Sequence, residues 1–533
     1  MASGMISALT TMRISEKAPG LFVWALGTVA WILFAALLVH VARGVADWLR
    51  LWWCLRDVPK PKPQKSFALF LDVYKQMSAM GPHVDAKVKA FRYLKGLFKS
   101  FEEQDVTVAF FGPYPILLGA TPQVAEAILG DPKNATKAFF YKMLKPWIGE
   151  SIITLENEPW RTRRKVMTPS FHFRILDDYT PIMDKRGKRL VQKLTSRSGE
   201  YFDVLPLLRA AAFGVLFETT MGIDYNEDDI ESVGYLKVHD AICEYILKRF
   251  TNFHHWFDYI YAFSKDRKDM LKHVAEAKVF VNNILQKRIA DYRKGIRDPV
   301  SKNSLLETFV RMFVDEGTLS ELDVRDEVLS TLIGGFDFTA TGLAFALYLL
   351  GHHPEIQEKV RDEIDAAFGD DWEKSLNPRR NKRSHVYGMR AEGGYEALSP
   401  GTTFGPFDNK RHKNWKAHYS SGYSSHRGFL FSSETSRYIK NPDSFMPERF
   451  MGAKSMPTYA YAPFSAGPRN CLGQKFALRE EKVILAHILR RFNVSSKVPI
   501  DELELAIDLV LKPIQGLELK FTPRTLLHRV ESS

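Results

Sequence analysis

One cysteine, Cys471, lies in a loop whose residue types and spacing suit metal chemistry. The stretch reads Pro-Phe-Ser-Ala-Gly-Pro-Arg-Asn-Cys-Leu-Gly from Pro463 to Gly473, and an apolar helical run starts near Gln474. A thiolate that binds haem iron pushes electron density onto the metal and favours O–O cleavage. The pattern therefore predicts that Cys471 is the axial ligand of a haem. The alternative is a buried, inert cysteine, the usual fate of a lone cysteine.

The residues spaced around Cys471 have physical roles that fit a haem thiolate. Gly467, four residues earlier, permits a turn with positive φ that folds the loop back under the ring. Backbone N–H groups of the loop and the start of the next helix stabilise a negative sulfur. Gly473 lets that helix lie close to the porphyrin, Phe464 shields the sulfur from water, and Arg469 pairs with a haem propionate. Agreement at these spaced positions favours the haem interpretation over the inert one.

This loop closely resembles the haem loop of the cytochrome P-450 monooxygenases, above all that of the membrane-bound branch that includes the fatty-acid ω-hydroxylases. The resemblance covers roughly residues 100–370 and 434–525. It implies a mainly α fold with small β-sheets, in one large haem domain behind an N-terminal transmembrane helix. It also implies non-covalent haem b, a lipophilic small-molecule substrate, and electrons from NADPH through a flavoprotein reductase. Cytochrome b5 is a further candidate partner.

Trp160 and Arg164 extend the resemblance, because residues four apart share one face of a helix. In the family this pair donates hydrogen bonds to the haem propionates. The alternative is a half-exposed tryptophan beside a solvated arginine. The neighbouring cations Arg161, Arg163 and Lys165 either serve a partner-facing surface or form a solvated face.

Residues 323–350 predict one long helix with two adjacent glycines at its centre. Glycine inside a helix costs about 1 kcal/mol relative to alanine, so the pair needs a reason. In the family, small residues here let the helix pass over the haem, and an acid followed by a hydroxyl relays protons. Asp337 matches the acid, whereas Phe338 replaces the usual threonine and Thr339 lies one residue further.

We therefore expect Asp337 and Thr339 to be the proton-relay residues, with a relay through water alone as the alternative. A buried aspartate at a helix kink, without a catalytic role, is the structural alternative. Gly334 occupies the position of a glutamate that esterifies the haem in the ω-hydroxylase branch, which is why non-covalent haem is expected.

The composition of the chain limits its class. The 533 residues contain three cysteines, which is no disulfide framework and fits a domain on the reducing side of a membrane. The formal charge of +12 has no nucleic-acid motif beside it, so nucleic acid is not expected as a partner. A membrane surface and an acidic redox partner explain the charge better.

The N-terminal region predicts a membrane anchor. Residues 21–41 are uncharged, apolar and long enough to span a bilayer, with basic residues mainly on their C-terminal side. We expect an endoplasmic-reticulum protein whose catalytic domain faces the cytosol; a cleaved signal peptide is the alternative. The expected division is a tail at 1–20, the anchor at 21–41, a basic proline-containing linker at 42–65, the haem domain at 66–525 and a tail at 526–533.

Shorter elements are predicted elsewhere in the haem domain. Residues 106–118 and 509–521 have the pattern of hairpins, the second with a turn at 513–516 that is a candidate substrate contact. Residues 175–290 are predicted to be helical, and so are residues 477–492 after the cysteine loop.

The family pattern fails between residues 378 and 433. This segment is rich in Arg, Lys, His, Gly and Ser and lacks the Glu-x-x-Arg helix that braces the cysteine loop with a later arginine, here Arg449. Glu434 and Arg437 match the Glu-x-x-Arg spacing, but they lie too late in the chain to be this motif. Codons that could encode residues 388–426 can be written out and translated again with the reading frame shifted by one base. This shifted translation permits the missing Glu-x-x-Arg helix and the strands that follow it, in the order found in the family. Our hypothesis is that the segment is out of frame.

Three functions follow from these observations. The first is a haem-thiolate monooxygenase that inserts one oxygen atom from dioxygen into an apolar substrate. The second is a defective product that cannot build its brace and loses haem. The third is a haem-thiolate isomerase or dehydratase that needs no reductase, which Phe338 favours weakly.

Overall fold

A computed structural model describes most of the chain in two compact units, one ending at Val58 and a main body that starts at Pro59. The described residues are 18–59, 69–99, 104–111, 114–119, 121–132, 136–223, 230–296, 304–369, 403–404, 428–431, 444–447, 459–506 and 508–524. Glu434, Arg437 and Arg449 lie outside them, as does almost all of the segment 378–433.

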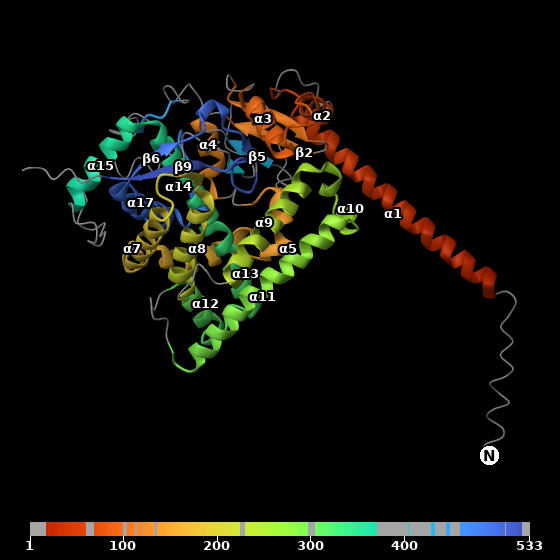
Figure 1. Cartoon of the computed structure of the whole chain (residues 1–533). Helices are drawn as coiled ribbons and strands as arrows, with labels where there is room; N and C mark the ends of the chain where they lie inside the picture. Colours follow the sequence, from red (N-terminus) through yellow and green to blue (C-terminus); the bar gives the residue numbers. More distant parts are fainter. Residues whose placement is uncertain are drawn as a thin grey trace, which may run out of the picture. The chain divides into compact units, whose positions relative to one another are not determined.

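The N-terminal unit is one long apolar helix, α1 (Ala18–Cys54), drawn in red in Figure 1. Its 37 residues correspond to about 55 Å at 1.5 Å per residue, and a bilayer core is about 30 Å thick. Within Gly27–Cys54, an 18-residue window has a mean hydropathy of 2.0 and no buried residue, as expected of a membrane-spanning helix. The helix includes residues 42–54, which the sequence placed in the linker; the proline-containing part at 60–65 is not described.

The main body is predominantly helical. Figure 1 shows α8, α13 and α14 in its interior, and α14 packs on α8, α17 and strand β6. Its helices are α2 (Leu69–Ala79), α3 (Ala86–Lys99), α4 (Pro122–Leu129), α5 (Lys145–Ile148), α6 (Asn157–Met167), α7 (Phe173–Thr195), α8 (Leu205–Met221), α9 (Ile230–Thr251), α10 (Asp258–Ala262), α11 (Lys265–Arg293), α12 (Leu305–Val314), α13 (Glu321–Gly335), α14 (Asp337–His352), α15 (Pro354–Phe368) and α17 (Gln474–Arg491).

Three small sheets lie beside the helices. β1 (Val106–Phe111) and β2 (Tyr114–Gly119) form the predicted hairpin, in which Val106 is opposite Gly119. β5 (Gly428–Phe431) adds to β2 in parallel, and β4 (Thr403–Phe404) pairs with β5. Both added strands come from the segment whose reading frame is in question.

The second predicted hairpin is wrong. β8 (Lys512–Pro513) pairs with β7 (Leu505–Ala506), whereas β9 (Glu518–Pro523) lies between β3 (Tyr201–Asp203) and β6 (Phe492–Ser496). The two strands flanking the 513–516 turn therefore belong to different sheets. Alternating apolar residues predicted the strands, but pairing is set by partners distant in the sequence.

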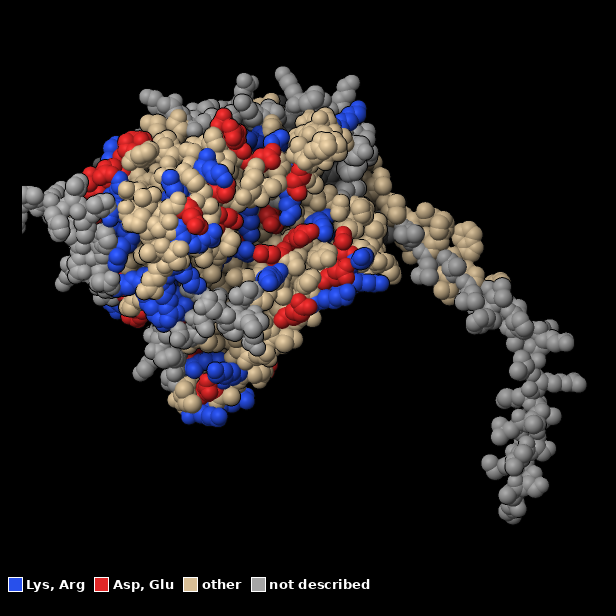
Figure 2. Space-filling model, in the orientation of Figure 1, with Lys and Arg blue, Asp and Glu red and all other residues tan. Residues whose placement is uncertain are grey.

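Charged side chains of both signs are interspersed on the face of the main body seen in Figure 2. This mixture is typical of a solvated surface, on which isolated charge pairs contribute little stability.

The predicted long helix at residues 323–350 is two helices, because α13 ends at Gly335 and α14 begins at Asp337. Phe336, between them, is fully buried, and its ring meets that of Phe213 edge-on with centroids 5.3 Å apart. The break follows the two adjacent glycines directly, so the weakest helical residues coincide with the interruption.

The two glycines have different environments. A Cβ on Gly335 would lie 2.5 Å from Leu216 Cδ2 of α8, so close packing of α13 on α8 requires glycine there. A Cβ on Gly334 would meet nothing within 4 Å.

We predict that Gly335→Ala lowers the free energy of unfolding by about 1–3 kcal/mol, since overpacking outweighs the gain in helix propensity. The adjacent Gly334→Ala is the matched control and should leave stability unchanged or raise it by up to about 1 kcal/mol. Urea titration of the full chain measures both. Equal effects of the two substitutions would contradict this packing.

Candidate functional site

The loop before α17 is folded tightly around Cys471. The Cys471 N–H donates to Phe464 O at 2.9 Å, and the Asn470 N–H donates to Gly467 O at 3.1 Å. Gly467 has φ +70°, which confirms the predicted turn. A Cβ there would lie 1.8 Å from Leu129 O, so the loop also needs glycine for close approach to the end of α4.

The Cys471 thiol is accessible to solvent although protein atoms surround it. Burial raises the pKa of the thiol, while hydrogen bonds from the backbone N–H groups of Gly473 and Gln474, and the charge of Arg164, lower it. These donors stand at the start of α17, where a negative sulfur is stabilised. The arrangement suits a thiolate that is completed by a metal rather than an inert core cysteine.

Trp160, Arg164 and Arg469, predicted to hold propionates, lie together beside this loop. Arg164 donates to the Asn470 carbonyl at 2.8 Å and to its side-chain Oδ1 at 2.6 Å. The Arg469 guanidinium lies 4.0 Å from the centre of the buried Trp160 ring and donates to Leu155 O at 2.6 Å. α6 supplies two of the three residues at one helical turn's spacing, as expected.

Two residues that the sequence reasoning missed belong to this cluster. Lys137 lies 4.4 Å from the centre of the Tyr141 ring. Burial, together with the charge of Arg469, lowers the pKa of Lys137 to about 7, and burial raises the pKa of Tyr141 to about 12. No motif marks Lys137, since it stands in an ordinary run between two helices.

Lys137, Arg164 and Arg469 therefore form a cluster of cationic side chains that are partly removed from water. Burial also lowers the pKa of Arg164, and it lowers that of Arg469 to about 10. Buried cations are stabilised by anions with hydrogen-bonding oxygens, and two carboxylates supply both. The donor set fits the two propionates of a haem whose iron binds Cys471.

The interior helices leave one face uncovered. Gly334 is exposed and Phe338 is 43% exposed, while the residues on either side of Phe338, Asp337 and Thr339, are 1% and 2% exposed. Gly334 and Phe338 are four residues apart and so share a face at the helix break. An uncovered apolar face in the middle of a buried helix pair fits a flat apolar cofactor.

Asp337 points away from that face, to α8 and β8. Its Oδ1 lies 2.7 Å from Arg209 Nε and its Oδ2 lies 2.8 Å from Lys512 Nζ. Arg209 also pairs with Asp240 of α9. Both Asp337 contacts are ion pairs with cations from neighbouring elements. Thr339, in the first turn of α14, donates to Gly335 O at the end of α13 at 3.2 Å, so this hydrogen bond crosses the helix break.

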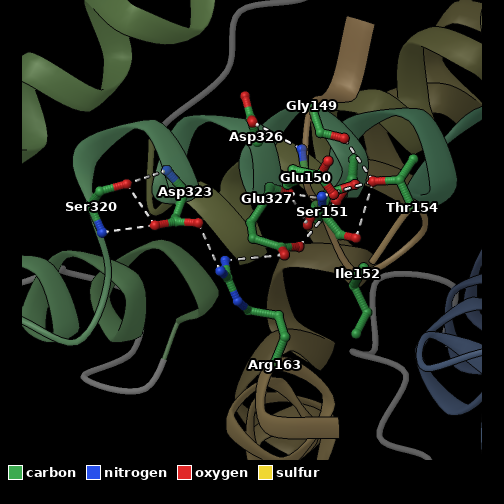
Figure 3. A network of polar contacts seen from close by, with 12 residues as sticks. Gly149, Glu150, Ser151, Ile152, Thr154, Arg163, Ser320, Asp323, Asp326 and Glu327 are labelled. Carbon is green, nitrogen blue, oxygen red and sulfur yellow. Dashed lines mark hydrogen bonds and ion pairs between the residues drawn. The ribbon is translucent and has the colours of Figure 1, made fainter. Parts of the chain in front are cut away.

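Arg163 is neither solvated nor partner-facing, which corrects one expectation. It is 9% exposed and donates to Asp323 Oδ1 at 2.9 Å and to Glu327 Oε1 at 3.2 Å, both on α13 (Figure 3). Arg161 and Lys165 are exposed, and Arg161 pairs with Glu158 on the surface. The difference follows from helical rotation, because position 163 faces α13.

Glu480 of α17 is a further feature that the sequence did not indicate. It is fully buried, and neither carboxylate oxygen has a hydrogen-bond partner among the described residues. Burial, and then the neighbouring charge of Glu481, raises its pKa well above the usual range. A buried carboxyl without a donor is costly, and among the described residues none donates a hydrogen bond to Glu480.

Comparisons with known proteins identify the family. The family model described as "Cytochrome P450" matches residues 77–383 and 434–521 and leaves 384–433 unmatched. The chain is 30% identical to "Cytochrome P450 4V2" of Rattus norvegicus over 528 residues, covering 95% of this chain and 97% of that protein. It is 31% identical to the Mus musculus protein of the same name, over 95% of this chain and 97% of that one. It is also 31% identical to "Cytochrome P450 4c3" of Drosophila melanogaster, over 78% and 81%.

We predict that Asp337→Asn lowers the free energy of unfolding by about 1–3 kcal/mol, because it leaves buried cations without their counter-ion. Lys512→Met in the Asp337→Asn background should then cost less than Lys512→Met alone. Urea unfolding of the four proteins of this cycle measures the coupling. Additive losses would contradict the Asp337–Lys512 pair.

Proposed function

Because this chain belongs to the cytochrome P450 family, on the branch of the 4V2 and 4c3 relatives, we propose that it hydroxylates an apolar substrate of the fatty-acid type. It is a haem-thiolate monooxygenase of mainly α fold. The observation that carries the site assignment is the desolvated cluster of Lys137, Arg164 and Arg469 beside the accessible Cys471 thiol.

Different residues of the site would bind different parts of the cofactor. Cys471 ligates the iron, and the N–H groups of Gly473 and Gln474 keep its sulfur negative. Arg164, Arg469 and Trp160 hold the propionates, while Gly467 and Phe464 shape and cover the loop. When bound, the thiolate-ligated haem activates dioxygen, and one oxygen atom enters the substrate while the other leaves as water.

Proton delivery is the step in which this chain departs from its family. Asp337 and Thr339 are the relay candidates, and Asp337 is bracketed by Arg209 and Lys512. Phe338 presents an apolar ring where the family has a hydroxyl. We infer that water on the Gly334–Phe338 face carries protons less efficiently than a threonine would, so that some reducing equivalents are lost to side products.

The proposal extends to location and partners. α1 anchors the protein in the endoplasmic-reticulum membrane, with basic residues on the cytosolic side and the catalytic domain in the cytosol. Electrons come from NADPH through a flavoprotein reductase, with cytochrome b5 as a second donor. Activity without NADPH and reductase would favour the isomerase alternative.

The second candidate, a haem-poor product, is favoured by two observations. The family model leaves 384–433 unmatched, and Glu480 on the helix that follows the cysteine loop has no hydrogen-bond partner among the described residues. Both fit a chain in which the Glu-x-x-Arg brace is out of frame. Sequencing the transcript across codons 370–440 tests this. An extra or missing base that restores the motif supports the enzyme, and a transcript that encodes the residues as printed supports the haem-poor product.

The thiolate assignment predicts that Cys471→Ser abolishes the thiolate-type absorption spectrum of the reduced carbon monoxide complex. The matched control is Cys54→Ser in α1, which should leave the spectrum unchanged. Spectra of detergent-solubilised full chain, in both the printed and the frame-restored form, give the readout. A thiolate spectrum retained by Cys471→Ser would overturn the assignment.

The relay argument predicts that Phe338→Thr raises the product formed per NADPH consumed, by roughly twofold to tenfold, since a positioned hydroxyl assists proton transfer. Haem content is measured on the same samples, and product is compared per haem, because Phe338 lies on the face that fits the cofactor. Product and NADPH are measured in the same assay. Unchanged coupling would show that water alone suffices.

A further inference from the structure

Two successive arginines of α6 point to opposite sides of the site. Arg164 donates to Asn470 in the cysteine loop, while Arg163 donates to Asp323 and Glu327 of α13. Asp323 is itself fixed, since its Oδ2 accepts from the Ser320 N–H at 2.9 Å in a capping box. A short stretch of α6 therefore links α13 to the cysteine loop.

A second link runs through the loop of residues 149–155, between α5 and α6 (Figure 3). Asp326 accepts from the Glu150 N–H at 3.2 Å, and Glu327 accepts a hydrogen bond from the Ile152 N–H. On its other side, Arg469 donates to Ile152 O at 3.3 Å and to Leu155 O. Ile152 thus contacts α13 through its N–H and the cysteine loop through its C=O.

The approach of this loop to α13 is close. Gly149 has φ +52°, and a Cβ there would lie 1.7 Å from Asp326 Oδ2. Thr154 closes the loop by donating to Gly149 O at 2.7 Å. The loop cannot shift without breaking its contacts with α13.

We propose that Arg163 and Glu327 are positioning residues that couple α13 to the cysteine loop through the 149–155 loop and α6. The charge on Glu327 holds Arg163, and so the helix that carries Trp160 and Arg164, in register with α13. It also fixes Ile152, and so the groups to which Arg469 donates. This proposal depends on the proposed function in one respect only, namely that the cysteine loop is the haem site.

Glu327 is the member of the pair that can change charge. It is fully buried; burial raises its pKa to about 7 from an ordinary 4.5, although Arg163, the Ile152 N–H and Ser330 oppose the shift. The charged groups that face it are Arg163 from α6 and Asp323 and Asp326 from α13. Around Asp326 stand Arg325 and, from α11, Lys278.

The sign of the pH effect follows. Above about pH 7 Glu327 is ionised in the folded protein, and the cost of its buried charge is present in full. As the pH falls from about 7 to 4.5 the folded carboxyl is neutral while the unfolded one remains ionised, so this group alone makes the folded state more stable. The coupling, which needs the charge, weakens over the same range.

Amide hydrogen exchange of the full chain tests the coupling without requiring haem. Glu327→Gln keeps the size of the side chain and one acceptor oxygen, but it removes the charge and replaces the second acceptor oxygen by an NH2 donor. At pH 8 it should reduce protection of residues 149–155 and of the 467–473 loop by on the order of fivefold relative to the unmodified chain. At pH 6 the two proteins should differ less than twofold, because Glu327 is then neutral in both.

Arg161→Gln is the matched control, since Arg161 lies on α6 but pairs with Glu158 on the surface. Arg163→Gln alone leaves a buried unpaired carboxylate, so the double variant Arg163→Gln/Glu327→Gln is included. The double variant should lose no more protection than Glu327→Gln does.

The proposal is overturned if the amides of residues 149–155 and 467–473 are equally protected in the unmodified chain and in Glu327→Gln at pH 8. It is also overturned if the losses of protection caused by the two single substitutions add in the double variant. Haem content, measured on the same samples, separates the two claims. A chain that takes up no haem but shows the expected exchange pattern refutes the proposed function and leaves the coupling intact. A chain that binds haem with unchanged exchange refutes the coupling alone.

Discussion

The site depends on positive charge that the protein buries beside a sulfur. Lys137, Arg164 and Arg469 are desolvated around Trp160, and each has a lowered pKa because burial penalises its charged form. Such a cluster is costly unless anions complete it. The cysteine loop has the matching property, since its backbone donors converge on a thiol whose pKa burial raises, and these hydrogen bonds oppose that rise. This donor set fits a dianionic cofactor.

The interior helices satisfy a second constraint, because they pack the core while the face at Gly334 and Phe338 stays exposed. Gly335 brings α13 against Leu216 of α8, and the break at Phe336 turns an apolar face outward at Gly334 and Phe338. The acid at the break is held by cations from α8 and β8. The orientation of Asp337 is consequently set by the ion pairs behind the helix as well as by the backbone at the break.

Residues 384–433 are the part of the chain between the two matched stretches that the family model leaves unmatched. The family model stops at 383 and resumes at 434, which coincides with the segment in which the expected motifs fail. Glu480 lies on the helix that follows the cysteine loop and has no hydrogen-bond partner among the described residues. A buried carboxyl without a hydrogen-bond donor carries the full cost of its desolvation.

The sequence by itself determined the chemistry. Cys471, Gly467 and the Trp160–Arg164 pair were identifiable because local spacing dictates a loop and a helix face, and the apolar run of α1 was identifiable because length and composition suffice. Only the tertiary structure decided the partners: that Arg163 is buried against Glu327, that Lys137 joins the cation cluster, that Asp337 faces Lys512, and that β8 and β9 enter different sheets. These ion pairs join residues more than 150 positions apart, and the strands pair with partners that local pattern does not identify. Burial, which raises the pKa of Glu327, exists only once the residues are packed.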